Sequence, residues 1–254
     1  MKSIFLTLSV AVLFNSLMSG DAYAQNYSLW PKRPPEIEQA RKLAHAGKGA
    51  EAVEILRPFV TQEGVVGREA RKITSAVQLP LYLSRRNPKA TIYVVKSGEA
   101  LNRIVNATQC PVELIMLLNG IVDPSALRAG QKLVVVQMGL RAEVNLRMRE
   151  LSVWDDDTLV ASYDIESHSL PNADENAATS IEAREGMIND EALHKRSTEF
   201  LCSQRMLKLA SGVIISASPQ AQSPSVCLKT ADVNELALLL NSGARVDIIY
   251  TDAR

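Results

Sequence analysis

Aromatic residues, histidines and cysteines are few in this sequence, and long apolar stretches are missing. Only 5% of the 254 residues are aromatic, with three histidines and three cysteines. No stretch after the N-terminus reaches the ~18 uninterrupted apolar residues that a membrane-spanning helix needs. No Lys- or Arg-rich tract with interleaved aromatics, typical of nucleic-acid binding, occurs either. We therefore expect no membrane span and no nucleic-acid partner.

What is present is ordinary globular composition with an uneven distribution of charge. The chain is 46% apolar and 22% charged, which excludes collagen, coiled coil and wholesale disorder. Its 28 basic and 28 acidic residues cancel, but residues 25–89 carry 12 basic and 6 acidic side chains, a net of +6. Residues 90–138 have a net of +1 (4 against 3), and residues 139–254 a net of −7 (11 against 18). This split indicates separate modules.

The N-terminus has the three parts of a secretory signal peptide. Lys2 gives a positive start, Ile4 to Phe14 is apolar, and Ala22-Tyr23-Ala24 is a small-x-small cleavage site before Gln25. The apolar run is too short to span a bilayer. We therefore expect a secreted protein, periplasmic or associated with the cell wall.

The three cysteines are Cys110, Cys202 and Cys227. An odd number leaves at least one thiol free or joined to another molecule. In an oxidising compartment Cys202 and Cys227 could pair, although spacing alone does not establish it.

A helical module follows a proline-rich linker at residues 25–35. Apolar residues recur at helical spacing from Glu36, stop at Gly47-Lys48-Gly49, and resume from Ala52 to Val60. A third helix is predicted from Gly67 to Leu83. Small alanines across the glycine-containing turn suit two closely packed antiparallel helices. The segment from Ala40 to Pro58 resembles a single tetratricopeptide-type hairpin, and the sequence contains no second copy of it. We expect a docking module, with a protein partner or a peptide-binding groove as alternatives.

Residues 92–136 predict two short strands around two helices. Ile92 to Val95 is rich in β-branched and aromatic residues and predicts a strand, and Gly98 permits a tight turn into a helix. Pro111 is expected in the first turn of a second helix, whose buried face is Leu114, Leu117 and Leu118. The closing strand is Leu133 to Val136.

This stretch resembles a LysM domain, a βααβ module that binds glycans containing N-acetylglucosamine. The matching positions are Tyr93-Val94-Val95-Lys96-Ser97-Gly98-Glu99-Ala100-Leu101, Ile104, Leu114 to Asn119, Pro124, Leu127 and Gly130-Gln131-Lys132-Leu133-Val134-Val135. The resemblance implies glycan contacts from two loops, formed by Gly98, Glu99, Ala100, Leu101, Asn119, Gly120, Ile121, Val122 and Asp123. Backbone groups would bond the sugar while aliphatic side chains cover its face. For Gly98, Asn119 and Gly130 the alternative is that they only shape turns.

The C-terminal third predicts mainly strands. Three alternating runs, at 142–146, 151–154 and 159–165, form a β-meander with Asp155-Asp156-Asp157 as a turn. Residues 168–199 have little β character and predict loops or a short helix. A strand pair broken at Gly212 is expected from Met206 to Ser216, then a helix from Val233 to Leu240 and a last strand from Gly243 to Ile249.

This order resembles the catalytic domain of L,D-transpeptidases (YkuD-type), which cross-link peptidoglycan through a cysteine. The family's Ile-His-Gly-Thr strand aligns with Ile215-Ser216-Ala217-Ser218, and its Ser-x-Gly-Cys-Ile-Arg loop aligns with Pro224-Ser225-Val226-Cys227-Leu228-Lys229. The cysteine is kept. The catalytic histidine falls on Ser225 or Ser216, and the arginine is Lys229, which lacks the bidentate fork.

The replacement of the family's histidine and arginine leaves two alternative functions. In the first, the protein is a non-catalytic peptidoglycan-binding protein with a transpeptidase-like scaffold. In the alternative, it is an active L,D-transpeptidase with Cys227 as nucleophile, Lys229 as a cation beside the thiolate, and His168 as a replacement base. No cofactor and no metal are expected in either case.

The fold class expected is α+β and multidomain, with an N-terminal α-helical hairpin, a βααβ LysM module and a mainly β YkuD-like domain. The predicted boundaries are a signal peptide at 1–24, a linker at 25–35, a helical module at 36–89, the LysM domain at 90–138 and the transpeptidase-like domain at 139–254.

Overall fold

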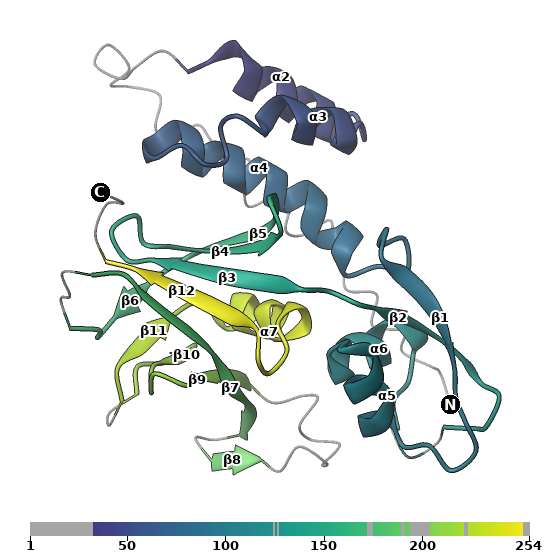
Figure 1. Cartoon of the computed structure of the whole chain (residues 1–254). Helices are drawn as coiled ribbons and strands as arrows, with labels where there is room; N and C mark the ends of the chain where they lie inside the picture. Colours follow the sequence, from purple (N-terminus) through teal and green to yellow (C-terminus); the bar gives the residue numbers. More distant parts are fainter. Residues whose placement is uncertain are drawn as a thin grey trace, which may run out of the picture.

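The computed structural model describes residues 33–123, 125, 127–171, 175–188, 191–193, 204–220 and 223–250. The predicted signal peptide, most of the linker, His194 and Cys202 lie outside these residues. Within them the chain is a mixed α+β protein, as predicted, with helices packed against a large curled sheet and a small two-stranded unit beside it (Figure 1).

Three helices form the N-terminal part. They are α2 (Pro35–His45), α3 (Gly49–Leu56) and α4 (Gly64–Tyr82). Ala40 of α2 and Ala52 of α3 are both fully buried, so the small residues predicted to face each other do lie in a shared core. That core also includes Trp154 and Leu159 of the C-terminal sheet, and in Figure 1 α4 lies along strands β4 and β5. The helices are therefore packed on the sheet.

The middle segment has the predicted βααβ order. Its elements are β1 (Ala90–Val94), α5 (Leu101–Thr108), α6 (Val112–Asn119) and β2 (Lys132–Val136), and β1 pairs with β2 in antiparallel fashion. Pro111 lies at the N-cap of α6, one position before the predicted first turn. Leu114 and Leu118 are buried as predicted, but Leu117 is 53% exposed, which corrects the predicted buried face.

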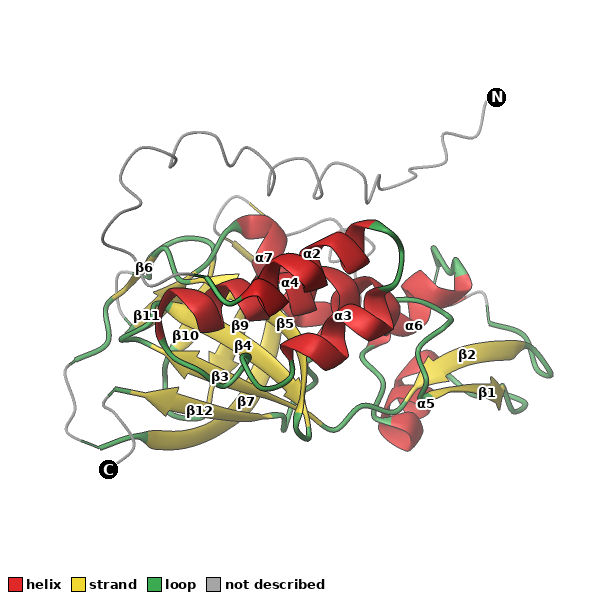
Figure 2. Cartoon of the chain, turned by 90° about the horizontal axis from the view of Figure 1, so that it is seen from above, coloured by secondary structure: helices red, strands yellow, loops and turns green. Residues whose placement is uncertain are grey.

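The C-terminal part is built on a curled sheet. Among the described residues its strand order is β5-β4-β3-β12-β7-β9-β10-β11-β6, with β8 paired to β7. The strands are β3 (Leu140–Asn145), β4 (Glu150–Asp155), β5 (Thr158–Asp164), β6 (Ser167–His168), β7 (Ala177–Ile188), β8 (Glu191–Leu193), β9 (Gln204–Leu209), β10 (Ile214–Ser216), β11 (Ser225–Cys227) and β12 (Arg245–Ile249). Helix α7 (Thr230–Leu239) contributes its apolar side chains to the core of this sheet. Figure 2 shows the sheet from above, with the small β1–β2 pair beside it.

Most of the predicted C-terminal elements are present, with one clear error. The meander β3–β4–β5, the pair β9–β10, helix α7 and strand β12 match the prediction. The prediction of loops or a short helix in residues 168–199 is wrong for 177–188, which form the longest strand of the sheet. Strand β7 pairs with β12 on one side and β9 on the other, so long-range pairing outweighs its weak β propensity.

No helix of the described residues is long and apolar enough to cross a bilayer.

Candidate functional site

The first loop of the βααβ unit is shaped by Glu99. Its carboxylate accepts hydrogen bonds from the Tyr93 hydroxyl at 2.8 Å and from the Lys96 backbone N–H at 2.9 Å. These two bonds, that of Lys96 first, lower the pKa of Glu99. Gly98 has a φ of +68°, which a glycine adopts without strain. The loop is therefore held in one conformation by its own residues.

Two further residues of the first predicted loop differ in exposure. Ala100 is exposed, whereas the Leu101 side chain is 3% exposed and lies in the core of the unit. The predicted glycan contact of Leu101 is thus corrected: its side chain packs inside, and only its backbone is near the loop surface.

The second loop is anchored by Asn119. Its Nδ2 donates to the backbone carbonyls of Ile115 at 2.8 Å and Val134 at 2.7 Å. Its Oδ1 accepts from the Val134 backbone N–H at 2.7 Å. The amide group is thus used to tie the end of α6 to β2, which favours the turn-shaping role for this side chain.

The rest of the second loop is open to solvent. Gly120 ends α6 in the left-handed conformation, with a φ of +63°. Val122 is 81% exposed, and the exposed Asp123 carboxylate accepts from the backbone N–H and hydroxyl of Ser125. Ile121 is half-buried. Leu117, on the last turn of α6, adds an exposed apolar side chain that the sequence pattern had assigned to the core.

Both loops are attached by hydrogen bonds to β2 or to the residues just before it. The first loop follows β1, and Val95 exchanges backbone hydrogen bonds with Gly130 and Gln131 just before β2 begins. The second loop is fixed to β2 at Val134. The two predicted glycan-binding loops therefore lie at the same end of the unit, with exposed backbone groups and the apolar side chain of Val122.

Cys227, the predicted nucleophile, lies at the end of β11. Its side chain is 3% exposed and its thiol is free. In the sheet it is opposite Ser216 of the parallel strand β10 and Ser167 of the antiparallel strand β6. The two segments aligned with the transpeptidase motifs are thus adjacent strands, and the free thiol leaves no disulfide from Cys227 to Cys202.

The two serines at the predicted histidine positions flank Cys227, and their hydroxyls are engaged in hydrogen bonds. The Ser216 hydroxyl donates to the Ser218 carbonyl at 2.6 Å. The Ser225 hydroxyl is 3.2 Å from that of Ser169, whose oxygen also accepts from the Ser225 backbone N–H. A hydroxyl is not a base at neutral pH, so neither serine can take the role of a histidine.

Of the other residues proposed to assist Cys227, His168 is not brought to its thiol. His168 is opposite Val226, and directly opposed residues in a sheet share a face, so His168 and Cys227 lie on opposite faces. Lys229 is exposed at the N-cap of α7. Burial raises the pKa of Asp232, and the nearby Lys229 charge partly offsets this rise. His45 lies on α2, in the N-terminal helices.

Among the described residues, no group of three or more His, Cys, Asp or Glu side chains is arranged to hold a metal ion.

Comparison with known proteins identifies the middle segment. Residues 93–136 match the family model of the LysM domain, so the βααβ unit is a LysM domain. A search of curated proteins finds no match. Among solved structures, the chain is similar to an L,D-transpeptidase (Yku) from Stackebrandtia nassauensis, with 11% identity and a TM-score of 0.32. That similarity covers 85% of this chain and 91% of the other. A TM-score this low carries no argument about activity.

Proposed function

We propose that this protein is exported to the cell wall and binds peptidoglycan through its LysM domain. The observation that carries the proposal is the LysM domain itself, whose two loops are held by hydrogen bonds to β2 and to the residues just before it. Export is supported by the order of charge, apolar run and cleavage site at residues 1–24. Mass spectrometry of the secreted protein should find Gln25 as the first residue.

The ligand is a glycan containing N-acetylglucosamine. Gly98, Ala100 and Gly120 are exposed loop residues, so the acetamido and hydroxyl groups of a sugar can approach their backbone. The Ala100 carbonyl and the Gly120 N–H are already used within the unit, by Arg103 and Leu117. Val122 and Leu117 supply apolar surface for the sugar face. The carboxylates of Glu99 and Asp123 hold the loops in shape through their own hydrogen bonds.

Retention on insoluble peptidoglycan tests this proposal. We expect Val122→Gln to lower the binding constant about tenfold, because covering a valine stabilises a complex by about 1.5 kcal/mol. Ile92→Gln is the matched control, since Ile92 is also exposed, at 59%, but lies on β1 and belongs to neither loop. Equal retention of the two variants would contradict the assignment of the loops.

We further propose that the C-terminal domain is a non-catalytic, transpeptidase-like scaffold. Support comes from Ser216 and Ser225 beside the buried Cys227, and from His168 on the other face of the sheet. An acyl-transfer site needs a base within reach of its nucleophile. Incubation with a carbapenem should therefore add no mass to Cys227. An adduct on Cys227 would instead favour the alternative, an active L,D-transpeptidase.

A further inference from the structure

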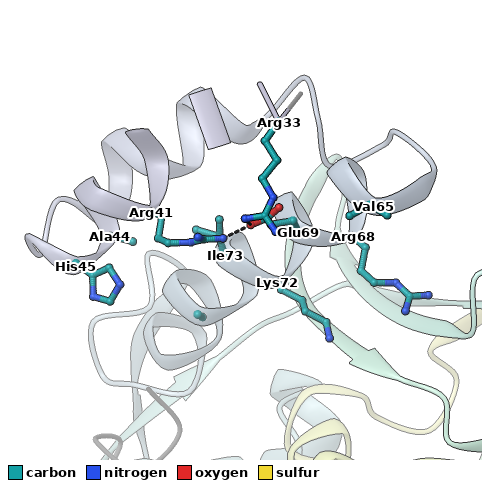
Figure 3. Close-up of a pocket in the computed structure, with 10 residues that line it drawn as sticks. Arg33, Arg41, Ala44, His45, Val65, Arg68, Glu69, Lys72 and Ile73 are labelled. Carbon is teal, nitrogen blue, oxygen red and sulfur yellow. Dashed lines mark hydrogen bonds and ion pairs between the residues drawn. The ribbon is translucent and has the colours of Figure 1, made fainter. Parts of the chain in front are cut away.

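A groove between α2 and α4 is not used by the proposed function. It encloses a pocket of about 310 Å³ (Figure 3). Six residues of α4 line it at helical spacing: Val65, Arg68, Glu69, Lys72, Ile73 and Ala76. Ala76 comes eleven positions after Val65 in the helix, so the groove follows α4 for about 16 Å.

Part of the groove is apolar and open to solvent. Val65 is 51% exposed, one of the few large apolar side chains so exposed among the described residues. Ile73 of α4 and Ala44 of α2 line the same pocket (Figure 3). Together with Ile73 and Ala44, the exposed Val65 gives the groove an apolar surface that an aliphatic side chain of a ligand can contact.

The groove also holds more cations than anions. Arg33 and Arg41 both pair with a single carboxylate, that of Glu69, and Figure 3 shows their side chains converging on it. Arg41 has a longer contact with Glu38, at 3.4 Å. Two guanidiniums carry ten N–H donors, so this arrangement leaves donors for a further acceptor.

Arg68 adds a third guanidinium. It donates to the backbone carbonyl of Met148, which carries no charge, and lies 3.9 Å from Glu150. Glu150 is already bound by both nitrogens of Arg71, at 2.8 Å each. Lys72, in contrast, is neutralised by Asp164 at 2.7 Å. The net positive charge of the groove therefore comes from Arg33, Arg41 and Arg68.

We propose that this groove docks an acidic peptide segment of a partner protein. Its carboxylates pair with Arg33, Arg41 and Arg68, and an aliphatic side chain covers Val65. A groove of 16 Å accommodates about five residues of extended chain, which is more than a single small anion needs. The guanidiniums of Arg33, Arg41 and Arg68, which line the groove, attract such a segment from solution. This inference does not depend on the glycan ligand.

Fluorescence anisotropy with the purified protein tests the docking. The probe is a fluorescein-labelled peptide, acetyl-Glu-Leu-Glu-Leu-Glu-amide, compared with Glu-Ser-Glu-Ser-Glu and Lys-Leu-Lys-Leu-Lys peptides. We expect the first to bind at least tenfold more tightly than the other two, and more weakly at high salt. Equal binding of the three peptides would overturn the proposal.

Matched variants locate the site. The double variant Arg33→Gln/Arg41→Gln should weaken binding of the acidic peptide at least tenfold, and Val65→Gln several-fold. The control, Arg85→Gln/Arg86→Gln, removes two exposed arginines after α4 and should leave binding unchanged. Equal loss in both double variants would show a non-specific charge effect and refute the site. Displacement of the probe by soluble peptidoglycan fragments would assign the groove to wall peptides and refute the protein partner.

Discussion

At the scale of single residues, Asn119 has a structural role that can be measured. Replacing it by alanine removes three hydrogen bonds and leaves the backbone groups of Val134 without their partner. We expect Asn119→Ala to lower the free energy of unfolding by about 2 kcal/mol, because an unsatisfied buried group costs about 1–3 kcal/mol. Urea unfolding measures this. Asn102→Ala, at an exposed position of α5, should change it by less than about 0.5 kcal/mol.

The two described cysteines should be unreactive in the folded protein. Burial raises the pKa of the Cys110 thiol to about 11, and Cys227 is 3% exposed. Thiolate and access are both needed for alkylation. We expect N-ethylmaleimide to modify neither at pH 7.5 in the native state and both in guanidinium, as followed by peptide mass mapping. Rapid native labelling of Cys227 would remove the main support for a non-catalytic domain.

Turn residues of the LysM domain could be predicted from the sequence, but the direction of its side chains could not. Gly98 and Gly120 have positive φ, a backbone conformation that glycine adopts readily, so their positions in turns could be predicted from the sequence. Leu117 was assigned to the buried face and is exposed, whereas Leu101, which the resemblance placed among the glycan contacts, has a buried side chain. At a loop–helix junction and on a last helical turn, exposure depends on neighbours that a single sequence does not reveal.

At the scale of elements, strand β7 shows that a strand can form where the local residue pattern does not predict one. Residues 177–188 contain alanine, serine, glutamate and arginine in positions where β-branched residues would mark a strand. The strand exists because β12 and β9 supply hydrogen-bonding partners on both sides. Strand β3 could be predicted because its more and less buried residues alternate along the sequence. Strand β4 is buried along its whole length, so its burial does not follow such an alternation.

Helix α7 carries a carboxyl group that should make stability depend on pH. Burial, and then the charge of Asp232, raise the pKa of Glu235 from 4.5 to about 7. The folded state therefore binds this proton more tightly than the unfolded state, so the group stabilises folding most below pH 4.5. That contribution is lost as the pH rises to about 7.

The variant Glu235→Gln tests this dependence. We expect it to raise the free energy of unfolding at pH 8 by on the order of 1 kcal/mol, and to have little effect at pH 4. Urea unfolding at the two pH values measures the difference. Glu175→Gln is the control, because Glu175 is exposed and its replacement should change the free energy of unfolding by less than about 0.5 kcal/mol. A loss of stability at pH 8 would contradict the expected sign.

At the scale of the whole molecule, the uneven charge has a structural explanation. The basic N-terminal helices and the acidic C-terminal domain are joined by ion pairs, among them Arg71–Glu150, Lys72–Asp164 and Lys89–Asp155. The charge split, from which we predicted separate modules, reflects the attraction between two segments that share a hydrophobic core. The sequence could not show this contact, because the paired residues lie 66 to 92 positions apart.

The LysM domain is joined to the C-terminal sheet by a buried charge cluster. Glu113 of α6 pairs with Arg184 of β7 at 2.5 Å and lies 4.0 Å from Arg205 of β9, and all three are buried. Arg184 also donates to the carbonyl of Ala237 in α7. Such a cluster fixes the orientation of the LysM domain relative to the sheet.

Removing Glu113 should therefore destabilise the assembly of the two parts. Glu113→Ala leaves the buried Arg184 guanidinium without its carboxylate, and breaking a buried pair in this way costs about 3–5 kcal/mol. We expect a loss of this size in urea unfolding, with the LysM domain unfolding separately from the sheet. Glu51→Ala, which removes an exposed pair with Lys48, should cost less than about 1 kcal/mol. If the two variants were equally stable, the cluster could not be what holds the LysM domain against the sheet.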